Sequence, residues 1–148
     1  MKKKTIICGF AGVGKSYLAK NVAGVVDLES TPFKKNWTTY VDVATHMQDN
    51  GYTVLLSCHK ELRQELKRRN RDYVVVIPAK KDKQNYLHRY ECRGNNQAFI
   101  DLFTEKWDDF LDEILKEEKN VIVLNNGTIS DFPLSSLDKP LTDNNKDI

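Results

Sequence analysis

The chain has 148 residues, of which 40% are hydrophobic and 30% are charged, and its formal net charge is +2. This composition is typical of one globular domain with its own core, and it excludes a disordered or low-complexity chain. The small net charge gives no reason to expect nucleic acid as a partner, and the absence of a long apolar run gives none to expect a membrane.

The first predicted element is a buried strand over residues Thr5–Phe10, and a predicted helix over Lys15–Val22 follows it. Between them lies the sequence GFAGVGKS, residues Gly9–Ser16, which matches the pattern G-x-x-x-x-G-K-[ST] at every fixed position. Glycines allow backbone N–H groups to converge on an anion, and a helix N-terminus adds positive potential. The motif therefore predicts a site for a nucleoside triphosphate.

In this motif the lysine neutralises the β- and γ-phosphates, and the hydroxyl that follows it binds Mg²⁺. Lys15 and Ser16 take these roles here, and ATP and Mg²⁺ are the expected cofactors. The predicted cofactor-binding residues are Gly9, Ala11, Gly12, Val13, Gly14, Lys15, Ser16 and Tyr17.

A second strand is predicted over Gly24–Asp27, and two carboxylates, Asp27 and Glu29, follow directly. Asp27 is a candidate Mg²⁺ ligand together with Ser16, or a base that accepts a proton from a hydroxyl. Glu29 is a candidate substrate contact. Trp37 begins a predicted helix that ends at Asn50-Gly51, and it is expected either to stack on a planar base or to join the core.

The third predicted strand, Tyr52–Cys58, precedes a basic helix over Lys60–Arg69. His59 and Arg63 are candidate contacts for an anionic acceptor. The fourth strand, Tyr73–Ile77, leads into the basic segment Lys80–Gly94. Phosphoryl transfer needs positive charge on the migrating group, and Arg89 and Arg93 of this segment are expected to supply it from a mobile flap.

A long helix is predicted over Asn95–Lys119, and a fifth strand over Val121–Leu124. The helix carries an apolar stripe formed by Phe99, Leu102, Phe103, Trp107, Phe110, Leu111, Ile114 and Leu115. We expect one domain over residues 1–132 and a polar tail over 133–148.

Alternating apolar strands and helices indicate an α/β fold, a three-layer α/β/α sandwich with a five-stranded parallel sheet. Ligands of such sheets bind at the carboxyl ends of the strands, where the candidate residues gather. The three cysteines, Cys8, Cys58 and Cys92, are far apart and favour neither a disulfide framework nor a zinc site. Reduced thiols and a nucleotide site together predict a cytoplasmic protein.

The phosphate loop, the acidic segment Asp27–Glu29 and the Arg89/Arg93 segment together resemble a small P-loop kinase of the nucleoside monophosphate kinase-like group. Shikimate and gluconate kinases are relatives of that group, and residues 56–63 (LSCHKELR) are similar to the strand-three exit of gluconate kinases. The resemblance covers about residues 4–126 as a pattern. It implies the P-loop NTPase fold, an acceptor site over the second and third strands, and a flap after the fourth strand.

By this resemblance the catalytic residues are Lys15, Asp27, Arg63, Arg89 and Arg93. Ser57 stands where a Walker B motif has Asp, so the metal is expected to rest on Ser16, water and Asp27. The adenine site is expected near residues 125–128, and the usual final helix is missing or replaced by the tail.

The leading hypothesis is an ATP-dependent kinase of a nucleoside or deoxynucleoside monophosphate. The alternatives are a kinase of a small hydroxylated metabolite, with Asp27 as the base, and a nucleotide-binding sensor without turnover. A polynucleotide end-kinase is a further possibility that the modest net charge does not favour. Both a monomer and a homodimer are compatible with the sequence.

Overall fold

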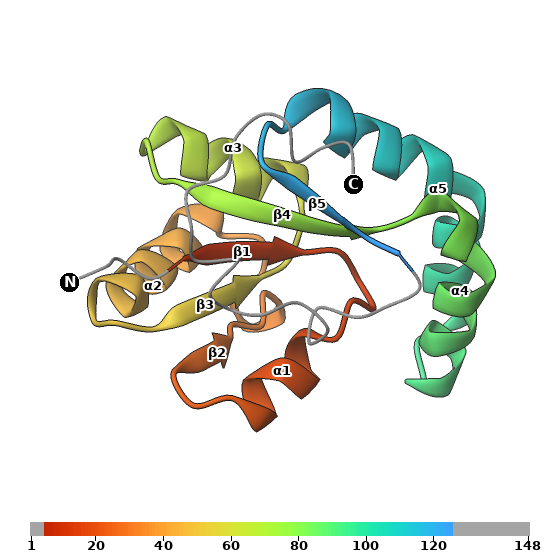
Figure 1. Cartoon of the computed structure of the whole chain (residues 1–148), viewed down its shortest axis with the longest axis horizontal. Helices are drawn as coiled ribbons and strands as arrows, with labels where there is room; N and C mark the ends of the chain where they lie inside the picture. The colour runs from red at the N-terminus through yellow and green to blue at the C-terminus, as the bar shows by residue number, and fades with distance from the viewer. Residues whose placement is uncertain (1–4, 126–148) are drawn as a thin grey trace.

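The structure, a computed structural model, describes residues 5–125. They form a five-stranded parallel sheet flanked by helices (Figure 1). The strands are β1 (Ile6–Gly9), β2 (Val25–Asp27), β3 (Thr53–Leu56), β4 (Tyr73–Pro78) and β5 (Val121–Leu124). The helices are α1 (Lys15–Asn21), α2 (Trp37–Asp49), α3 (Lys60–Arg68), α4 (Lys83–Cys92) and α5 (Gln97–Glu117), with 3-10 turns η1 (Thr31–Phe33) and η2 (Lys80–Asp82). The α/β class and the parallel sheet are confirmed, whereas the expected tail over 133–148 lies outside the described residues.

The strand order is β2-β3-β1-β4-β5, so β1 occupies the centre of the sheet. Ile7 of β1 pairs with Leu55 of β3 on one side and with Val74 of β4 on the other. The loop that follows β1 therefore leaves the sheet between the ends of β3 and β4. With right-handed crossovers, this order puts α1 on one face and α2, α3 and α5 on the other. That arrangement is compatible with three layers.

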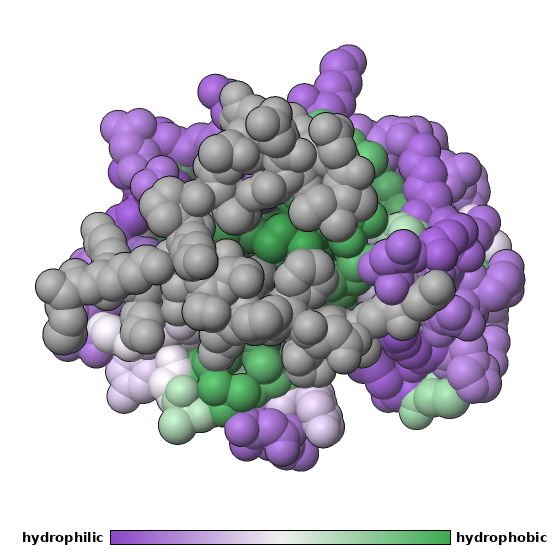
Figure 2. All heavy atoms as spheres, viewed as in Figure 1, coloured by the Kyte–Doolittle hydropathy of each residue, from purple (hydrophilic) through white to green (hydrophobic). Residues whose placement is uncertain are grey.

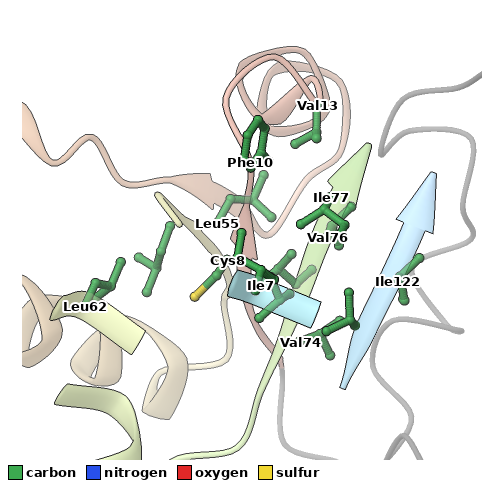
Figure 3. Packing of buried hydrophobic residues seen from close by; sticks show 14 of the residues in the cluster. Ile7, Cys8, Phe10, Val13, Leu55, Leu62, Val74, Val76, Ile77 and Ile122 are labelled. Carbon is green, nitrogen blue, oxygen red and sulfur yellow. The ribbon is translucent and has the colours of Figure 1, made fainter. Parts of the chain in front are cut away.

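Strand residues in the middle of the sheet are buried, as expected for a parallel sheet that is covered on both faces. All four residues of β1 and of β3 are buried, and Ile6, Ile7 and Cys8 have no exposed surface. Figure 3 shows Ile7, Leu55 and Val76 converging in this core. Apolar residues show in the centre of the face in Figure 2, and polar residues surround them. No helix within residues 5–125 is both long enough and apolar enough to cross a membrane.

Capping side chains set where the two longest helices begin. The Asn36 side chain accepts from the Thr39 amide at 3.1 Å, and Asn96 does the same for the Phe99 amide at 2.9 Å. The long helix predicted over Asn95–Lys119 is accordingly shorter at both ends. Most of its apolar stripe packs inward, but Leu102 is 46% exposed, which corrects the expectation that the whole stripe is core.

A buried ion-pair cluster joins α3, β4 and the end of α5. The Arg63 guanidinium is 2% exposed and donates to Glu118 at 2.6 Å and to Glu117 at 3.2 Å. Glu118, 3% exposed, also accepts from Lys67 at 2.6 Å and from the Tyr73 hydroxyl at 2.5 Å. Burial alone would raise the pKa of Glu118, but these hydrogen bonds outweigh it and hold that pKa below its ordinary value.

We expect Glu118→Gln to destabilise the fold by about 3 kcal/mol, since it leaves the buried Arg63 charge without its nearest carboxylate. Urea denaturation followed by circular dichroism measures this loss. The matched control is Glu65→Gln, because Glu65 forms ion pairs with Arg68 and Arg69 on the exposed side of α3 and should matter far less. Equal losses for the two variants would contradict a stabilising role for the buried cluster.

The same cluster predicts how stability depends on pH. Because the folded pKa of Glu118 is depressed, its contribution is fully present above its unfolded pKa, near 4.5, and is lost as pH falls through the folded value. The stability difference between wild type and Glu118→Gln should therefore be constant from pH 7 to pH 5 and should shrink below about pH 4.5. A difference that does not shrink at low pH would contradict this assignment.

Candidate functional site

The site is built around the turn between β1 and α1. Gly12 and Gly14 have φ angles of 89° and 99°, in the left-handed region that favours glycine. The Phe10 amide donates to the Val76 carbonyl at 2.9 Å, and the Val13 amide donates to the Phe10 carbonyl at 3.2 Å. Two of the three glycines in Gly9–Ser16 thus lie where the backbone conformation favours glycine.

Two apolar residues of the motif anchor this turn in the core. Phe10 is 4% exposed and makes edge-on contacts with the rings of Phe103 and Trp107, each at 5.6 Å. Val13 is fully buried, and Figure 3 shows both side chains above the ends of the strands. The motif pattern treats these positions as variable, so it gave no sign of this anchoring.

Lys15 lies at the start of α1 with its side chain folded along the turn. Its Nζ donates to the Gly9 carbonyl at 2.8 Å. Burial lowers the pKa of Lys15, and the nearby carboxylate of Asp27 opposes that effect in part. A negatively charged ligand at this position would stabilise the ammonium further, as expected for a phosphate site.

The two predicted Mg²⁺ ligands lie in contact. The Ser16 hydroxyl donates to Oδ2 of Asp27, the last residue of β2, at 3.0 Å. Within residues 5–125 no group of three or more His, Cys, Asp or Glu side chains forms a metal site. The pair suits a Mg²⁺ ion that takes its other ligands from phosphate and water, which is how Mg²⁺ usually binds beside a nucleotide.

A cavity of about 640 Å³ opens beside the turn, and we name it the loop cavity. It brings together residues from three separate parts of the sequence: the motif, the end of β2 and α4. The predicted residues that line it are Ala11, Gly12, Gly14, Lys15, Ser16, Tyr17, Asp27, Glu29, Arg89 and Arg93. Most of the candidate set therefore lines one cavity, which holds both cations and carboxylates.

A second cavity of about 480 Å³, the aromatic cavity, adjoins the first. Ala11, Lys15, Ser57 and Phe99 line both cavities. The wall of the aromatic cavity that α5 contributes is apolar and consists of Phe99, Leu102, Phe103, Phe110 and Ile114, with Glu113 beside them. Sequence reasoning assigned these residues only to the helix core. Leu102 belongs to the same apolar stripe as the buried residues, so the sequence did not show that its side chain is exposed.

His59, at the start of α3, lines the aromatic cavity and contacts Ser57. Its Nδ1 lies 2.9 Å from the Ser57 hydroxyl, and its ring lies 4.9 Å from that of Trp37. Burial lowers the pKa of His59, so the ring is mostly neutral at pH 7. Trp37 packs on His59 and Tyr40 and lines neither cavity, which favours the packing interpretation over base stacking.

The structure argues against the predicted anion-binding role of Arg63. Although Arg63 borders the aromatic cavity, its donors are held by Glu117, Glu118 and the Cys58 carbonyl. The position of Arg63 one turn into α3 correctly predicted that it lies near the carboxyl ends of the strands, where it borders the aromatic cavity. The carboxylates that hold it lie more than 50 residues later in the chain, and the spacing could not reveal them.

The expected flap is a packed helix. Tyr86, Leu87 and Tyr90 of α4 are buried against α5 and the turn. Arg89 lies with its guanidinium 4.3 Å from the centre of the Tyr86 ring and donates to the Gly12 carbonyl at 2.9 Å. Arg93, in contrast, is exposed at the rim of the loop cavity. The polar and basic composition of the segment gave no sign that its aromatic residues are buried.

No protein-family model matches this sequence, and no curated protein shows significant similarity to it. The functional argument therefore depends on the geometry of the two cavities. The adenine site expected near residues 125–128 falls almost entirely outside the described residues.

We expect Gly12→Ala to be markedly destabilising, because a Cβ there would lie 2.9 Å from the Tyr90 ring and 3.0 Å from the Tyr86 ring. The matched control is Gly24→Ala. Gly24 has a similar φ of 81°, but its added Cβ would meet nothing within 4 Å. The control should lose about 1 kcal/mol from backbone strain, and Gly12→Ala about 1–3 kcal/mol more from the clash. Urea denaturation compares them, and equal losses would show that α4 does not press on the turn.

Proposed function

We propose that this protein is a phosphotransferase with the P-loop NTPase fold, and that it transfers the γ-phosphoryl group of ATP to a nucleoside monophosphate. One observation carries the proposal: the Ser16–Asp27 hydrogen bond forms beside Lys15 in a cavity that shares four lining residues with a second, aromatic cavity. In this proposal the loop cavity binds the triphosphate with its metal ion, and the aromatic cavity binds the acceptor.

The loop cavity suits the donor. The turn of Gly9–Ser16 supplies backbone amides, and Lys15 supplies a cation for the β- and γ-phosphates. Ser16 and Asp27 hold Mg²⁺, while Arg89 and Arg93, which line the same cavity, stabilise the charge that develops on the migrating group. When bound, the metal neutralises phosphate charge in the same space.

The aromatic cavity suits the base and sugar of a nucleotide acceptor. Its apolar wall on α5 offers rings for a planar base, and Lys15 and Ser57 stand where the two cavities meet. An acceptor that lies there would direct its phosphate toward the γ-phosphate of the donor. Catalysis would then consist of positioning and charge neutralisation, because a phosphate acceptor has no proton to lose at neutral pH.

A kinase of a small hydroxylated metabolite is the second candidate, and the contact between His59 and Ser57 favours it. A hydroxyl acceptor must lose a proton, and the neutral His59 lines the aromatic cavity in contact with Ser57, where it could act as the base. Asp27 suits this task less well than expected from the sequence, since Ser16 already engages it.

The first experiment measures binding and turnover. We expect calorimetry to detect ATP binding in the presence of Mg²⁺, and Lys15→Ala to weaken it about 100-fold or more, since a charge-assisted contact to two phosphates is lost. ADP release is then measured with a panel of nucleoside monophosphates and sugar acids. Binding of ATP without release for any acceptor would favour the sensor, and an absence of binding to both ATP and GTP would contradict the proposal.

Two variants separate the acceptor classes. For a phosphate acceptor, we expect His59→Gln to leave kcat within about threefold, and for a hydroxyl acceptor to lower it about 100-fold or more, since general-base catalysis contributes that much. Asp27→Asn should weaken the dependence on Mg²⁺ in both cases, with recovery at high Mg²⁺ concentration. Steady-state kinetics at several Mg²⁺ concentrations distinguish a lost base from a lost metal ligand.

A further inference from the structure

Two neighbouring residues of α4, Arg89 and Tyr90, donate hydrogen bonds to backbone carbonyls of the turn Gly9–Ser16. The Tyr90 hydroxyl donates to the Ala11 carbonyl at 2.8 Å, and Arg89 donates to the Gly12 carbonyl at 2.9 Å. Both carbonyls thus point toward α4. Tyr90 comes from a segment almost 80 residues further along the chain, and no motif pattern includes it.

A peptide group is planar, and its C=O and N–H bonds point in opposite directions in the trans form. The described peptides are all trans. By holding the Ala11 carbonyl toward α4, Tyr90 therefore fixes the Gly12 N–H in the opposite direction, and Gly12 itself lines the loop cavity. Within residues 5–125 no acceptor takes a hydrogen bond from this N–H, so it is available to a ligand.

Arg89 acts on a different peptide. Its partner, the Gly12 carbonyl, shares a peptide with the Val13 amide, which already donates to the Phe10 carbonyl. The hydrogen bond from Arg89 is thus a second restraint on the Gly12–Val13 peptide, which a bond within the turn already fixes. The Ala11–Gly12 peptide has only the Tyr90 bond among the contacts of the described chain.

Tyr90 is itself held rigidly. Its side chain is fully buried, and its ring makes edge contacts with Phe99 and Phe103, each at 5.2 Å. Burial raises the pKa of Tyr90, so the hydroxyl keeps its proton and remains a donor throughout the physiological range. A donor fixed by two aromatic neighbours can set the direction of a flexible glycine peptide.

We propose that Tyr90 is a positioning residue that orients the Gly12 amide for the phosphate groups of the nucleotide, an inference that rests on the proposed nucleotide-binding function. Without the hydroxyl, the peptide before Gly12 would be free to turn, and the nucleotide would have to order it on binding.

The test uses ¹⁵N-labelled full-length protein titrated with Mg·ADP, for wild type, Tyr90→Phe and Tyr73→Phe. Tyr73→Phe is the matched control, since it also removes a hydroxyl with one partner, Glu118, but on the far side of β4 from the turn. We expect Tyr90→Phe to weaken Mg·ADP binding about five- to tenfold, the worth of one hydrogen bond, and Tyr73→Phe to leave it unchanged.

The Gly12 amide resonance gives a readout that a loss of stability would not produce. In wild type and in Tyr73→Phe it should shift downfield with Mg·ADP, and in Tyr90→Phe it should be broadened without ligand and shift less. In wild type alone, Mg·ADP should also slow exchange of the Tyr90 hydroxyl proton, a measurement that does not require the variant to fold.

The outcomes separate the two proposals. Suppose that the wild type binds Mg·ADP but that Tyr90→Phe has the same affinity and the same Gly12 shift, or that Mg·ADP leaves the exchange rate of the Tyr90 hydroxyl unchanged. Either result overturns the role of Tyr90 and leaves the proposed function standing. An absence of Mg·ADP binding to the wild type overturns the proposed function and, with it, this inference.

Discussion

The turn Gly9–Ser16 is held by the buried side chains of Phe10, Val13 and Tyr90 and by the half-buried Arg89, and the rest of the candidate site depends on this constraint. A turn whose amides face an anion must direct its carbonyls elsewhere, and each carbonyl then needs a donor. Phe10 and Val13 fix the turn to the core below it, while Tyr90 and Arg89 bind the carbonyls of Ala11 and Gly12. The turn that we propose as the phosphate site is therefore held in place by the protein's own side chains.

This arrangement also explains why α4 is a wall and not a loose flap. The aromatic residues that hold the turn are the same ones that pack on α5, so a large movement of α4 would expose Tyr86 and Tyr90. Burying one such ring is worth about 2 kcal/mol, which disfavours opening of the whole helix. Motion needed for entry of substrates is more easily accommodated by the exposed end of the segment, which carries Arg93.

The sequence was sufficient to predict the strands, their parallel pairing and the phosphate motif, because these depend on local patterns of apolar residues and glycines. It was also sufficient to bring Asp27 to Ser16, since the carboxyl ends of all strands in a parallel sheet lie at one edge, although β3 separates β2 from β1. It was not sufficient for Arg63, because a guanidinium at the edge of a site can face a substrate or a buried carboxylate, and Glu118 is distant in sequence. The apolar stripe of α5 likewise does not show which of its residues pack in the core and which line a cavity, because that depends on elements distant in sequence.

Ser57 directly follows β3, where the resemblance would place an aspartate. Under the proposed function, Asp27 of β2 supplies the carboxylate instead, and β2 pairs directly with β3, so the negative charge moves by one strand and stays at the same edge of the sheet. This leaves the end of β3 uncharged. A neutral Ser57 beside Lys15 repels no incoming phosphate, whereas an aspartate at the junction of the two cavities would oppose an anionic acceptor. The substitution is therefore consistent with an acceptor that carries its own negative charge.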